Sequence, residues 1–168
     1  MILSASRRTD IPQYYASWFY RRLREGFVCV RNPMNPHRIS RIPLSSAIVD
    51  CIVFWTKNPE GMLCSLSELE AYPYYFQFTL TGYGKEIELG LPDKKHLLAV
   101  FKELSQRVGS ERVVWRYDPI FISRRYPASY HLRAFEEIAK TLRGSADTVV
   151  ISFLDAYAKI RRRMEAFD

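Results

Sequence analysis

Polar and charged side chains follow most of the apolar runs in this sequence, at the points where strands are expected to end. The first run, Ile2 to Ala5, leads into Ser6-Arg7-Arg8-Thr9-Asp10, and a later one leads into Trp55-Thr56-Lys57-Asn58-Pro59. Guanidinium and amine groups bind anions, and carboxylates bind or transfer protons. The repetition of such endings along the chain predicts a binding or catalytic face.

Two residues of opposite charge stand on one face of a predicted strand in the second half of the chain. Arg116 and Asp118 are two residues apart, and side chains alternate between the two faces of a strand. A buried guanidinium without a partner is strongly unfavourable, so Arg116 must pair with Asp118, contact water or face a ligand. An ion pair that only ties strands together is the alternative to a substrate site.

The same alternation divides the run Tyr74 to Thr81 into two faces. One face is expected to pack against helices and carries Tyr74, Phe76, Phe78 and Leu80. The other carries Tyr75, Gln77, Thr79 and Thr81. If the neighbouring strands share this arrangement, Gln77 lies on the same face as Arg116, Asp118 and Ser152, which predicts a polar face built from several strands.

The candidate site residues are drawn from these strand ends. The candidate catalytic groups are Asp10, Lys57, Arg116, Asp118 and Asp155. The candidate substrate-binding residues are Ser6, Arg7, Arg8, Arg31, Asn32, Trp55, Asn58, Gln77, Thr79, Tyr83, Trp115, Tyr117 and Ser152. The basic members predict an anionic, phosphate- or nucleotide-like substrate, and the aromatic members could stack on a ring or belong to the core.

The spacing of apolar residues predicts strands that alternate with helices. Strands are expected at 2–5, 27–31, 49–55, 74–80, 112–117 and 148–153, and helices at 12–25, 60–70, 92–108 and 129–143. Two Asn-Pro pairs between residues 31 and 44 predict a turn, so the second strand is expected to double back as a hairpin through 38–42.

This order of elements predicts an α/β fold with parallel βα repeats. The most consistent architecture is an incomplete TIM-barrel-like domain of about six strands, where eight close a barrel, and a doubly wound open sheet is the alternative. The helical spacing of Ile160, Met164 and Phe167 continues to the last residues. Residues 1–168 are therefore expected to form a single βα-barrel-like domain that is truncated at its C-terminus.

The composition narrows the classes of partner. The formal net charge of +7 indicates an acidic partner such as nucleic acid or a phosphorylated small molecule. Lys and Arg are scattered along the chain, however, which is also typical of solvated helix faces. No run approaches the roughly 20 apolar residues of a membrane helix, and the first residues do not resemble a signal peptide. We therefore expect a cytoplasmic protein without a membrane partner.

The sequence predicts no metal or cofactor bound within this chain. Cys29, Cys51 and Cys64 are too far apart for a C-x-x-C knuckle, and the three histidines lack ligand spacing. We interpret the cysteines as buried thiols in a reducing compartment. The Walker, G-x-G-x-x-G, H-E-x-x-H and G-x-S-x-G motifs are missing, and no histidine is placed for a serine triad.

Several motifs together resemble an uncharacterised prokaryotic family, the domain of unknown function 1848. They are Ser4-Ala5-Ser6-Arg7-Arg8-Thr9-Asp10-Ile11-Pro12, Val30-Arg31-Asn32-Pro33, Phe54-Trp55-Thr56-Lys57-Asn58-Pro59, Phe76-Gln77-Phe78-Thr79-Leu80-Thr81, Trp115-Arg116-Tyr117-Asp118-Pro119 and Ile151-Ser152-Phe153. The resemblance implies a longer protein with a cysteine-rich tail, in which an iron-sulfur cluster and S-adenosylmethionine are expected, as in radical S-adenosylmethionine enzymes. It further implies that residues 1–168 carry the substrate face without the redox centre.

Two functional hypotheses follow. The first is an enzyme, or the substrate-binding portion of one, that holds an anionic substrate in an enclosed pocket lined by Arg8, Lys57, Arg116 and Asp118. The second is a non-catalytic nucleic-acid-binding module, in which Arg and Lys side chains form a continuous basic stripe on the surface.

Overall fold

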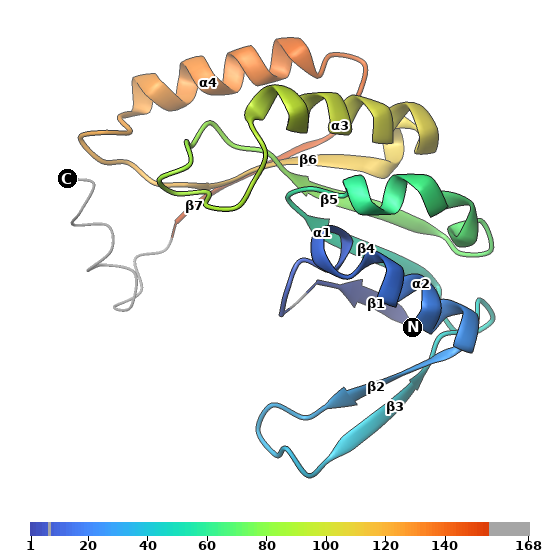
Figure 1. The fold of residues 1–168 in the computed structure, drawn as a ribbon. Coiled ribbons are helices and arrows are strands. Elements are labelled where there is room, and N and C mark those ends of the chain that lie inside the picture. Colours follow the sequence, from blue (N-terminus) through green and yellow to red (C-terminus); the bar gives the residue numbers. More distant parts are fainter. Residues whose placement is uncertain (7, 155–168) are drawn as a thin grey trace. The chain divides into compact units, whose positions relative to one another are not determined.

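The chain folds into strands that alternate with helices (Figure 1), and the computed structural model describes residues 1–6 and 8–154. It forms two compact units, Met1–Phe76 and Gln77–Asp168. Five strands form a parallel sheet in the order β1-β4-β5-β6-β7, and β2 and β3 form a separate antiparallel hairpin. The α/β class and the hairpin are therefore confirmed, whereas closure into a barrel stays a prediction.

The first unit begins with parallel pairing between strands that are distant in the sequence. Its elements are β1 (Ile2–Ala5), α1 (Ile11–Tyr14), α2 (Ala16–Glu25), β2 (Phe27–Arg31), β3 (Ile39–Pro43), β4 (Cys51–Thr56), the 3₁₀ helix η1 (Glu60–Leu69) and the start of β5 (Tyr74–Thr79). β1 pairs with β4 from Ile2 opposite Cys51 to Ala5 opposite Phe54. This register brings the residues that follow both strands to one edge of the sheet.

Aromatic rings fill the core of this unit. Phe19 of α2 packs edge-on against Phe54 with ring centroids 5.3 Å apart, and Phe54 stacks on Phe76 at 4.8 Å. All three side chains are buried. The single helix predicted over residues 12–25 is instead two helices, because Tyr15 leaves the helical region at φ −135°.

The hairpin of β2 and β3 stands apart from the parallel sheet. Its strands pair from Phe27 opposite Pro43 to Arg31 opposite Ile39. At the turn, Oδ1 of Asn32 accepts hydrogen bonds from the backbone N–H groups of the two residues Met34 and Asn35. Because β2 belongs to the hairpin, the parallel sheet formed by the described residues has five strands and not the predicted six.

The second unit contains two long helices whose ends lie within two residues of those that the sequence predicts. Its elements are the rest of β5, α3 (Lys94–Val108), the 3₁₀ helix η2 (Ser110–Arg112), β6 (Val113–Ile120), α4 (Ala128–Thr141) and β7 (Val149–Phe153). Asp93 caps α3 by accepting a hydrogen bond of 2.9 Å from the backbone N–H of His96, and Gly109 ends the helix at positive φ.

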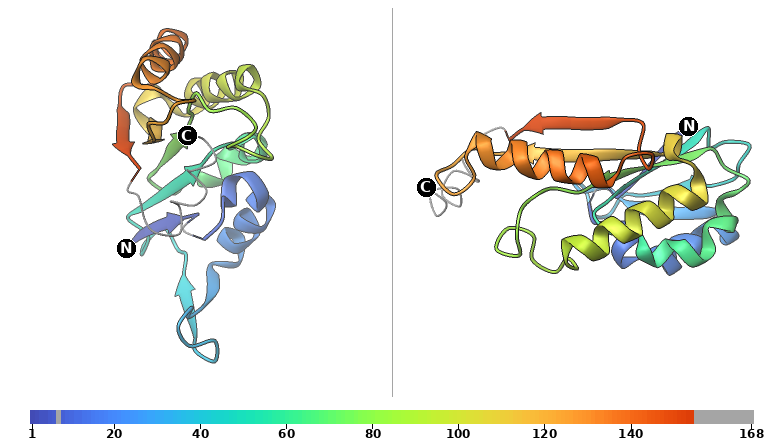
Figure 2. Two further views of the ribbon diagram at one scale, coloured as in Figure 1. Left: turned by 90° about the vertical axis from the view of Figure 1, so that its left-hand side faces the viewer. Right: turned by 90° about the horizontal axis from the view of Figure 1, so that it is seen from above.

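Both long helices cover the same side of β5, β6 and β7 (Figure 1 and Figure 2). Phe78 packs against Phe101 of α3 with centroids 4.9 Å apart, and Trp115 stacks on Phe135 of α4 at 4.8 Å. Because successive side chains alternate along a strand, Gln77 and Arg116 belong to the opposite face. We call this second surface the polar face.

Candidate functional site

A hydrogen-bonded network joins three neighbouring strands on the polar face of the second unit. Nε of Arg116 donates to Oδ2 of Asp118 at 3.1 Å, and Nη2 donates to the same oxygen. Nη1 of Arg116 donates to Oε1 of Gln77 at 3.2 Å, while the hydroxyl of Ser152 donates to Oδ1 of Asp118. Residues of β5, β6 and β7 thus meet at one carboxylate and one guanidinium.

Strand periodicity and parallel pairing explain why these four residues meet. Arg116 and Asp118 are both on the polar face of β6, because they are separated by one residue. β6 and β7 pair in parallel with Arg116 opposite Val150, so Ser152 lies two residues further along β7, level with the region of Asp118. The predicted grouping of Gln77, Arg116, Asp118 and Ser152 on one face is what the structure shows.

The network holds charged groups in fixed orientations while leaving them partly accessible. The side chains of Arg116 and Asp118 are 16% and 19% exposed. Guanidinium groups commonly bind oxyanions, and a carboxylate held by a hydroxyl and a guanidinium can orient a substrate or accept a proton. Both groups were candidate catalytic residues, and their catalytic roles stay predictions.

A second polar cluster lies in the first unit, where the loop after β1 meets the end of β4. Oδ2 of Asp10 accepts a hydrogen bond of 2.7 Å from the backbone N–H of Lys57, and Oδ1 accepts one of 3.0 Å from Gln13. Asp10 is therefore the N-cap of α1, and it also joins the loop after β1 to the loop after β4. Burial raises the pKa of Asp10 above its ordinary value, and the hydrogen bonds from Lys57, Thr56 and Gln13 offset only part of that effect.

Three other predicted site residues of the first unit have local structural roles. Oγ of Ser6 accepts a hydrogen bond from the backbone N–H of Ile11 at 3.1 Å, and Oδ1 of Asn58 accepts one from that of Glu60 at 3.2 Å. Asn32 builds the hairpin turn. Such contacts shape the loops in which a ligand site would form, without showing contact to a ligand.

The remaining predicted residues of this unit are more accessible. Nη2 of Arg8 donates to the backbone carbonyl of Arg31 at 3.2 Å, so these two predicted residues are brought together. Trp55 is 38% exposed at the end of β4, and Lys57 is half-buried. Stacking of Trp55 on a ring stays a prediction.

Two aromatic residues that were candidates for substrate binding lie on the helix-covered face of β6. Trp115 and Tyr117 are buried against α4, where both rings pack on Phe135. The alternation that sends Arg116 to the polar face sends its two neighbours to the helix-covered face. Both side chains belong to the core, on the face opposite Arg116, and a role for them in substrate binding stays a prediction.

Tyr83 is likewise buried, in the loop that follows β5. Its hydroxyl donates to the carbonyl of Pro119 at 2.9 Å and accepts from the backbone N–H of Phe121 at 3.0 Å. Burial raises the pKa of Tyr83 to about 12. The side chain therefore fixes the segment after β6, a role that does not need a ligand.

The candidates fall into the two units as follows. Gln77, Thr79, Tyr83, Trp115, Arg116, Tyr117, Asp118 and Ser152 belong to the second unit, and Ser6, Arg8, Asp10, Arg31, Asn32, Trp55, Lys57 and Asn58 to the first. Arg7 and Asp155 lie outside the described residues. A single pocket that combines Arg8 and Lys57 with Arg116 stays a prediction.

One buried acid in the second unit was not among the predicted site residues. Glu88 is 7% exposed and forms an ion pair with Lys94 in the first turn of α3. The two residues flank the turn that leads into the helix, and only their opposite charges could have suggested the pair. Its role concerns the start of α3, away from the polar face.

The cysteines do not fit an iron-sulfur cluster. Cys29 and Cys64 are exposed and Cys51 is half-buried, which corrects their interpretation as buried thiols. They belong to β2, η1 and β4, and no group of three or more His, Cys, Asp or Glu side chains in residues 1–6 and 8–154 could hold a metal ion. Within that same part of the chain, no helix has the length and apolar character to cross a bilayer.

Parallel strands that alternate with helices, with a charged network on the face opposite α3 and α4, define an α/β protein with a candidate polar binding face. The chain belongs to the family described as Domain of unknown function (DUF1848), whose model matches residues 2–168. The resemblance seen in the sequence motifs is thereby confirmed. No curated protein and no solved structure matches the chain.

Proposed function

We propose that this protein is an enzyme, or the substrate-binding portion of one, that holds a small anionic substrate at the carboxyl ends of its strands. Arg116 binds the anion, and Asp118 orients the guanidinium and accepts a proton from the substrate or a bound water. The main support is the fixed position of Arg116, which Asp118 and Gln77 hold on the polar face. A planar guanidinium in a fixed position binds oxyanions through paired N–H donors.

The energetics of ion pairs favour a binding role over a purely structural tie. Enclosing an ion pair contributes little net stability, because the loss of hydration opposes the attraction between the charges. Apolar side chains on this face would join β5, β6 and β7 at least as well. Charged side chains that stay partly exposed at Arg116 and Asp118 therefore support a site for a charged ligand.

The substitution Arg116→Ala tests this proposal, with adenosine monophosphate and inorganic phosphate as probes in isothermal titration calorimetry. We expect the affinity for both probes to fall at least about tenfold, because hydrogen bonds to charged groups contribute roughly 1.5–3 kcal/mol. Arg116→Lys keeps the charge without the planar fork and should lose less. Arg143→Ala removes an exposed cation after α4 and should leave both affinities unchanged.

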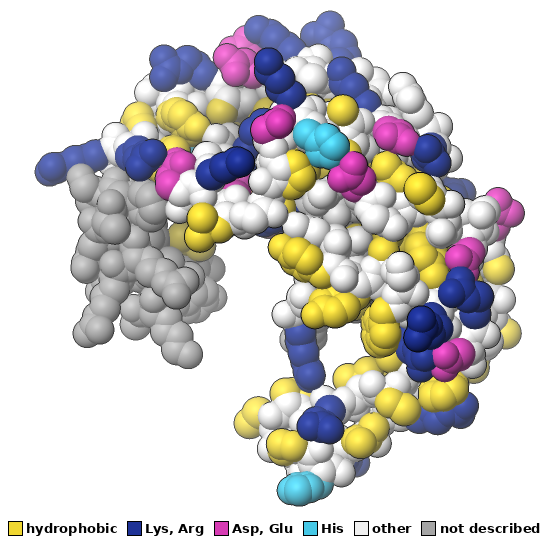
Figure 3. All heavy atoms as spheres, viewed as in Figure 1, with side chains coloured by type: hydrophobic (Ala, Val, Ile, Leu, Met, Phe, Trp, Pro, Cys, Tyr) yellow, Lys and Arg dark blue, Asp and Glu magenta, His cyan; other side chains and the backbone are white. Residues whose placement is uncertain are grey.

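Unchanged phosphate affinity in a folded Arg116→Ala protein would reject the proposal. If duplex DNA then binds with a steep salt dependence that Arg143→Ala weakens, the protein is a nucleic-acid-binding module. The face drawn in Figure 3 gives that alternative no support, because Lys and Arg side chains over α3 and α4 are interleaved with Asp and Glu. If Arg116→Ala fails to fold and Arg116→Lys folds, the phosphate affinity of the lysine variant tests the proposal instead.

A further inference from the structure

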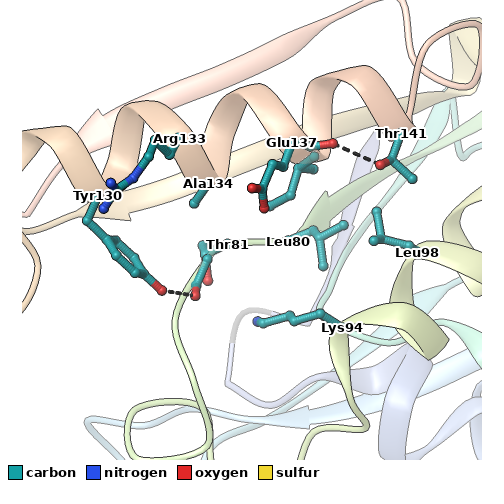
Figure 4. Close-up of a pocket in the computed structure, with 11 residues that line it drawn as sticks. Leu80, Thr81, Lys94, Leu98, Tyr130, Arg133, Ala134, Glu137 and Thr141 are labelled. Carbon is teal, nitrogen blue, oxygen red and sulfur yellow. Dashed lines mark hydrogen bonds between the residues drawn. The ribbon is translucent and has the colours of Figure 1, made fainter.

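A crevice of about 380 Å³ opens between the end of β5 and the helices α3 and α4, on the side of the sheet away from the polar face. Figure 4 shows Tyr130, Arg133 and Glu137 along α4, Leu80 and Thr81 below them, and Lys94 and Leu98 of α3 on the remaining side. This size is in the range of small-molecule sites. All of its lining residues belong to the second unit.

The wall of the crevice contains a buried hydroxyl that lacks a hydrogen bond. Thr81 is fully buried, and its Oγ1 has no partner in the part of the chain that the structure describes. Buried polar groups in proteins are nearly always bonded, so this hydroxyl is a candidate partner for a polar atom of a ligand or for a bound water. Strand alternation predicted Thr81 on the polar face. Because β5 already ends at Thr79, Thr81 lies at the crevice instead.

Charged side chains lie on both sides of the crevice, with Arg133 and Glu137 one turn apart on α4 and Lys94 on α3. Glu137 extends from α4 towards Leu80, and Lys94 lies across the crevice on α3 (Figure 4). Lys94 forms an ion pair with Glu88, while Glu137 and Arg133 form no ion pair within residues 1–6 and 8–154. An ammonium group would be attracted by Glu137, and a carboxylate by Lys94 across the crevice.

Apolar side chains line the space between these charges. Leu80 at the end of β5, Leu98 of α3 and Ile138 of α4 form the walls, and the hydroxyl of Tyr130 is already used in donating to the carbonyl of Gly82 at 2.6 Å. A ligand that fits must therefore combine an apolar body with one positive and one negative group and an atom that bonds to a hydroxyl.

We propose that this crevice binds a free α-amino acid with an apolar side chain. Its ammonium group faces Glu137, its carboxylate faces Lys94, and one carboxylate oxygen accepts a hydrogen bond from Thr81. The apolar side chain occupies the space between Leu80, Leu98 and Ile138. This site is separate from the proposed anion site, and it does not depend on Arg116.

Three compounds with the same ring test the proposal by calorimetry and by methyl chemical shifts. L-phenylalanine carries both charges, 3-phenylpropionate lacks the ammonium group, and 2-phenylethylamine lacks the carboxylate. We expect L-phenylalanine to bind at least about tenfold more tightly than either analogue, with the largest shifts at the methyl groups of Thr81 and Ala134. Absence of saturable binding by L-phenylalanine, or equal binding of all three, would overturn the proposal.

Two substitutions assign the contacts. Thr81→Val removes the hydroxyl with little change in shape, and we expect L-phenylalanine to bind about three- to tenfold more weakly while the folded state is as stable as before. Glu137→Gln should abolish the preference for L-phenylalanine over 3-phenylpropionate. Glu136→Gln changes the adjacent residue, which pairs with Lys140, and should have no effect.

The variants also separate this site from the anion site. Arg116→Ala should leave L-phenylalanine binding unchanged, whatever happens to phosphate binding. An unchanged L-phenylalanine affinity in both Thr81→Val and Glu137→Gln would place the amino acid elsewhere and reject the assignment. If Thr81→Val fails to fold, the result for Glu137→Gln alone decides the proposal.

Discussion

Nδ1 of His131 lies 3.0 Å from the hydroxyl of Tyr117, and both side chains are buried in the second unit. Nε2 of the same imidazole is 3.0 Å from the backbone carbonyl of Phe121. A carbonyl can only accept, so Nε2 donates a hydrogen bond to Phe121, and Nδ1 shares a hydrogen bond with the hydroxyl of Tyr117. Both ring nitrogens are bonded, and the side chain joins α4 to β6 and to the segment that follows it.

Tyr117→Phe should therefore destabilise the protein. The variant keeps the ring but leaves Nδ1 of buried His131 without a hydrogen-bond partner, and an unsatisfied buried polar group costs about 1–3 kcal/mol. Urea denaturation followed by circular dichroism measures the change. Tyr14→Phe alters an exposed tyrosine and should change the free energy of unfolding by less than about 0.5 kcal/mol. Equal stability of both variants would show that the bond to His131 contributes nothing.

The pair on the polar face should show energetic coupling. In a double-mutant cycle with Arg116→Gln and Asp118→Asn, we expect a coupling of about 1–3 kcal/mol, because both side chains are mostly buried and share two hydrogen bonds. Thermal or urea unfolding of the four proteins provides the four stabilities.

The exposed pair of Glu103 and Arg107 on α3 is a matched control for this cycle. Its side chains are both 47% exposed, and it spans one helical turn. Exposed pairs of this kind couple by about 0.3–0.5 kcal/mol. A coupling for Arg116 and Asp118 no greater than that of the helix pair would mean that solvent screens the network, and the fixed guanidinium of the proposed site would lose its support.

Much of this network follows from the sequence, because strand alternation and parallel pairing are simple geometric rules. The two-residue spacing of Arg116 and Asp118 fixed their common face, and the β-branched run before Ser152 placed a parallel strand beside them. The same alternation assigns Trp115 and Tyr117 to α4. Their prediction as substrate-binding residues grouped them with Arg116 by nearness in sequence, and it did not take account of the face to which each side chain points.

The ends of elements were predictable only where local chemistry sets them. Asp93 and Gly109 mark α3, and the Asn-Pro pairs mark the hairpin, because capping and turn preferences are properties of a few adjacent residues. The break at Tyr15 and the end of β5 at Thr79 depend on tertiary packing. The crevice beside Thr81 could not be predicted, since it exists only because the strand ends one residue before Leu80.

Asp10 and Asp93 cap different helices, and their titrations should have opposite effects on stability. Burial raises the pKa of Asp10 above its ordinary 3.8, so the folded chain keeps this proton at pH values where the unfolded chain has lost it. The contribution of Asp10 to stability therefore falls as pH rises from 3.8 through its folded pKa. The stability difference between wild type and Asp10→Asn should be greatest at low pH and should shrink as pH rises.

Asp93→Asn is the control with the reverse sign. The hydrogen bond from the backbone N–H of His96 lowers the pKa of Asp93, so its contribution is complete above its ordinary pKa and is lost as pH falls. The difference between wild type and Asp93→Asn should therefore grow as pH rises. Urea denaturation at several pH values from about 3 to 7 follows both differences. Parallel trends for the two variants would contradict the assigned directions.

Gly82 lies where the chain after β5 passes closest to α4, and this approach leaves no room for a side chain. A Cβ atom at Gly82 would be 2.7 Å from Cβ of Ala134 and 3.3 Å from the hydroxyl of Tyr117. We expect Gly82→Ala to cost about 1–3 kcal/mol in the free energy of unfolding, as overpacked sites do. Ala134→Gly alone should cost about 0.5–1 kcal/mol, as glycine inside a helix does.

The double variant distinguishes this steric explanation from a change in chain flexibility. If the contact with Ala134 is the cause, Gly82→Ala combined with Ala134→Gly should be more stable than the sum of the two single effects predicts, because each change makes room for the other. Thermal unfolding of the four proteins measures this. If the two losses of stability simply add, Gly82→Ala acts through its own backbone or through Tyr117. In that case α4 can move away from β5 without cost.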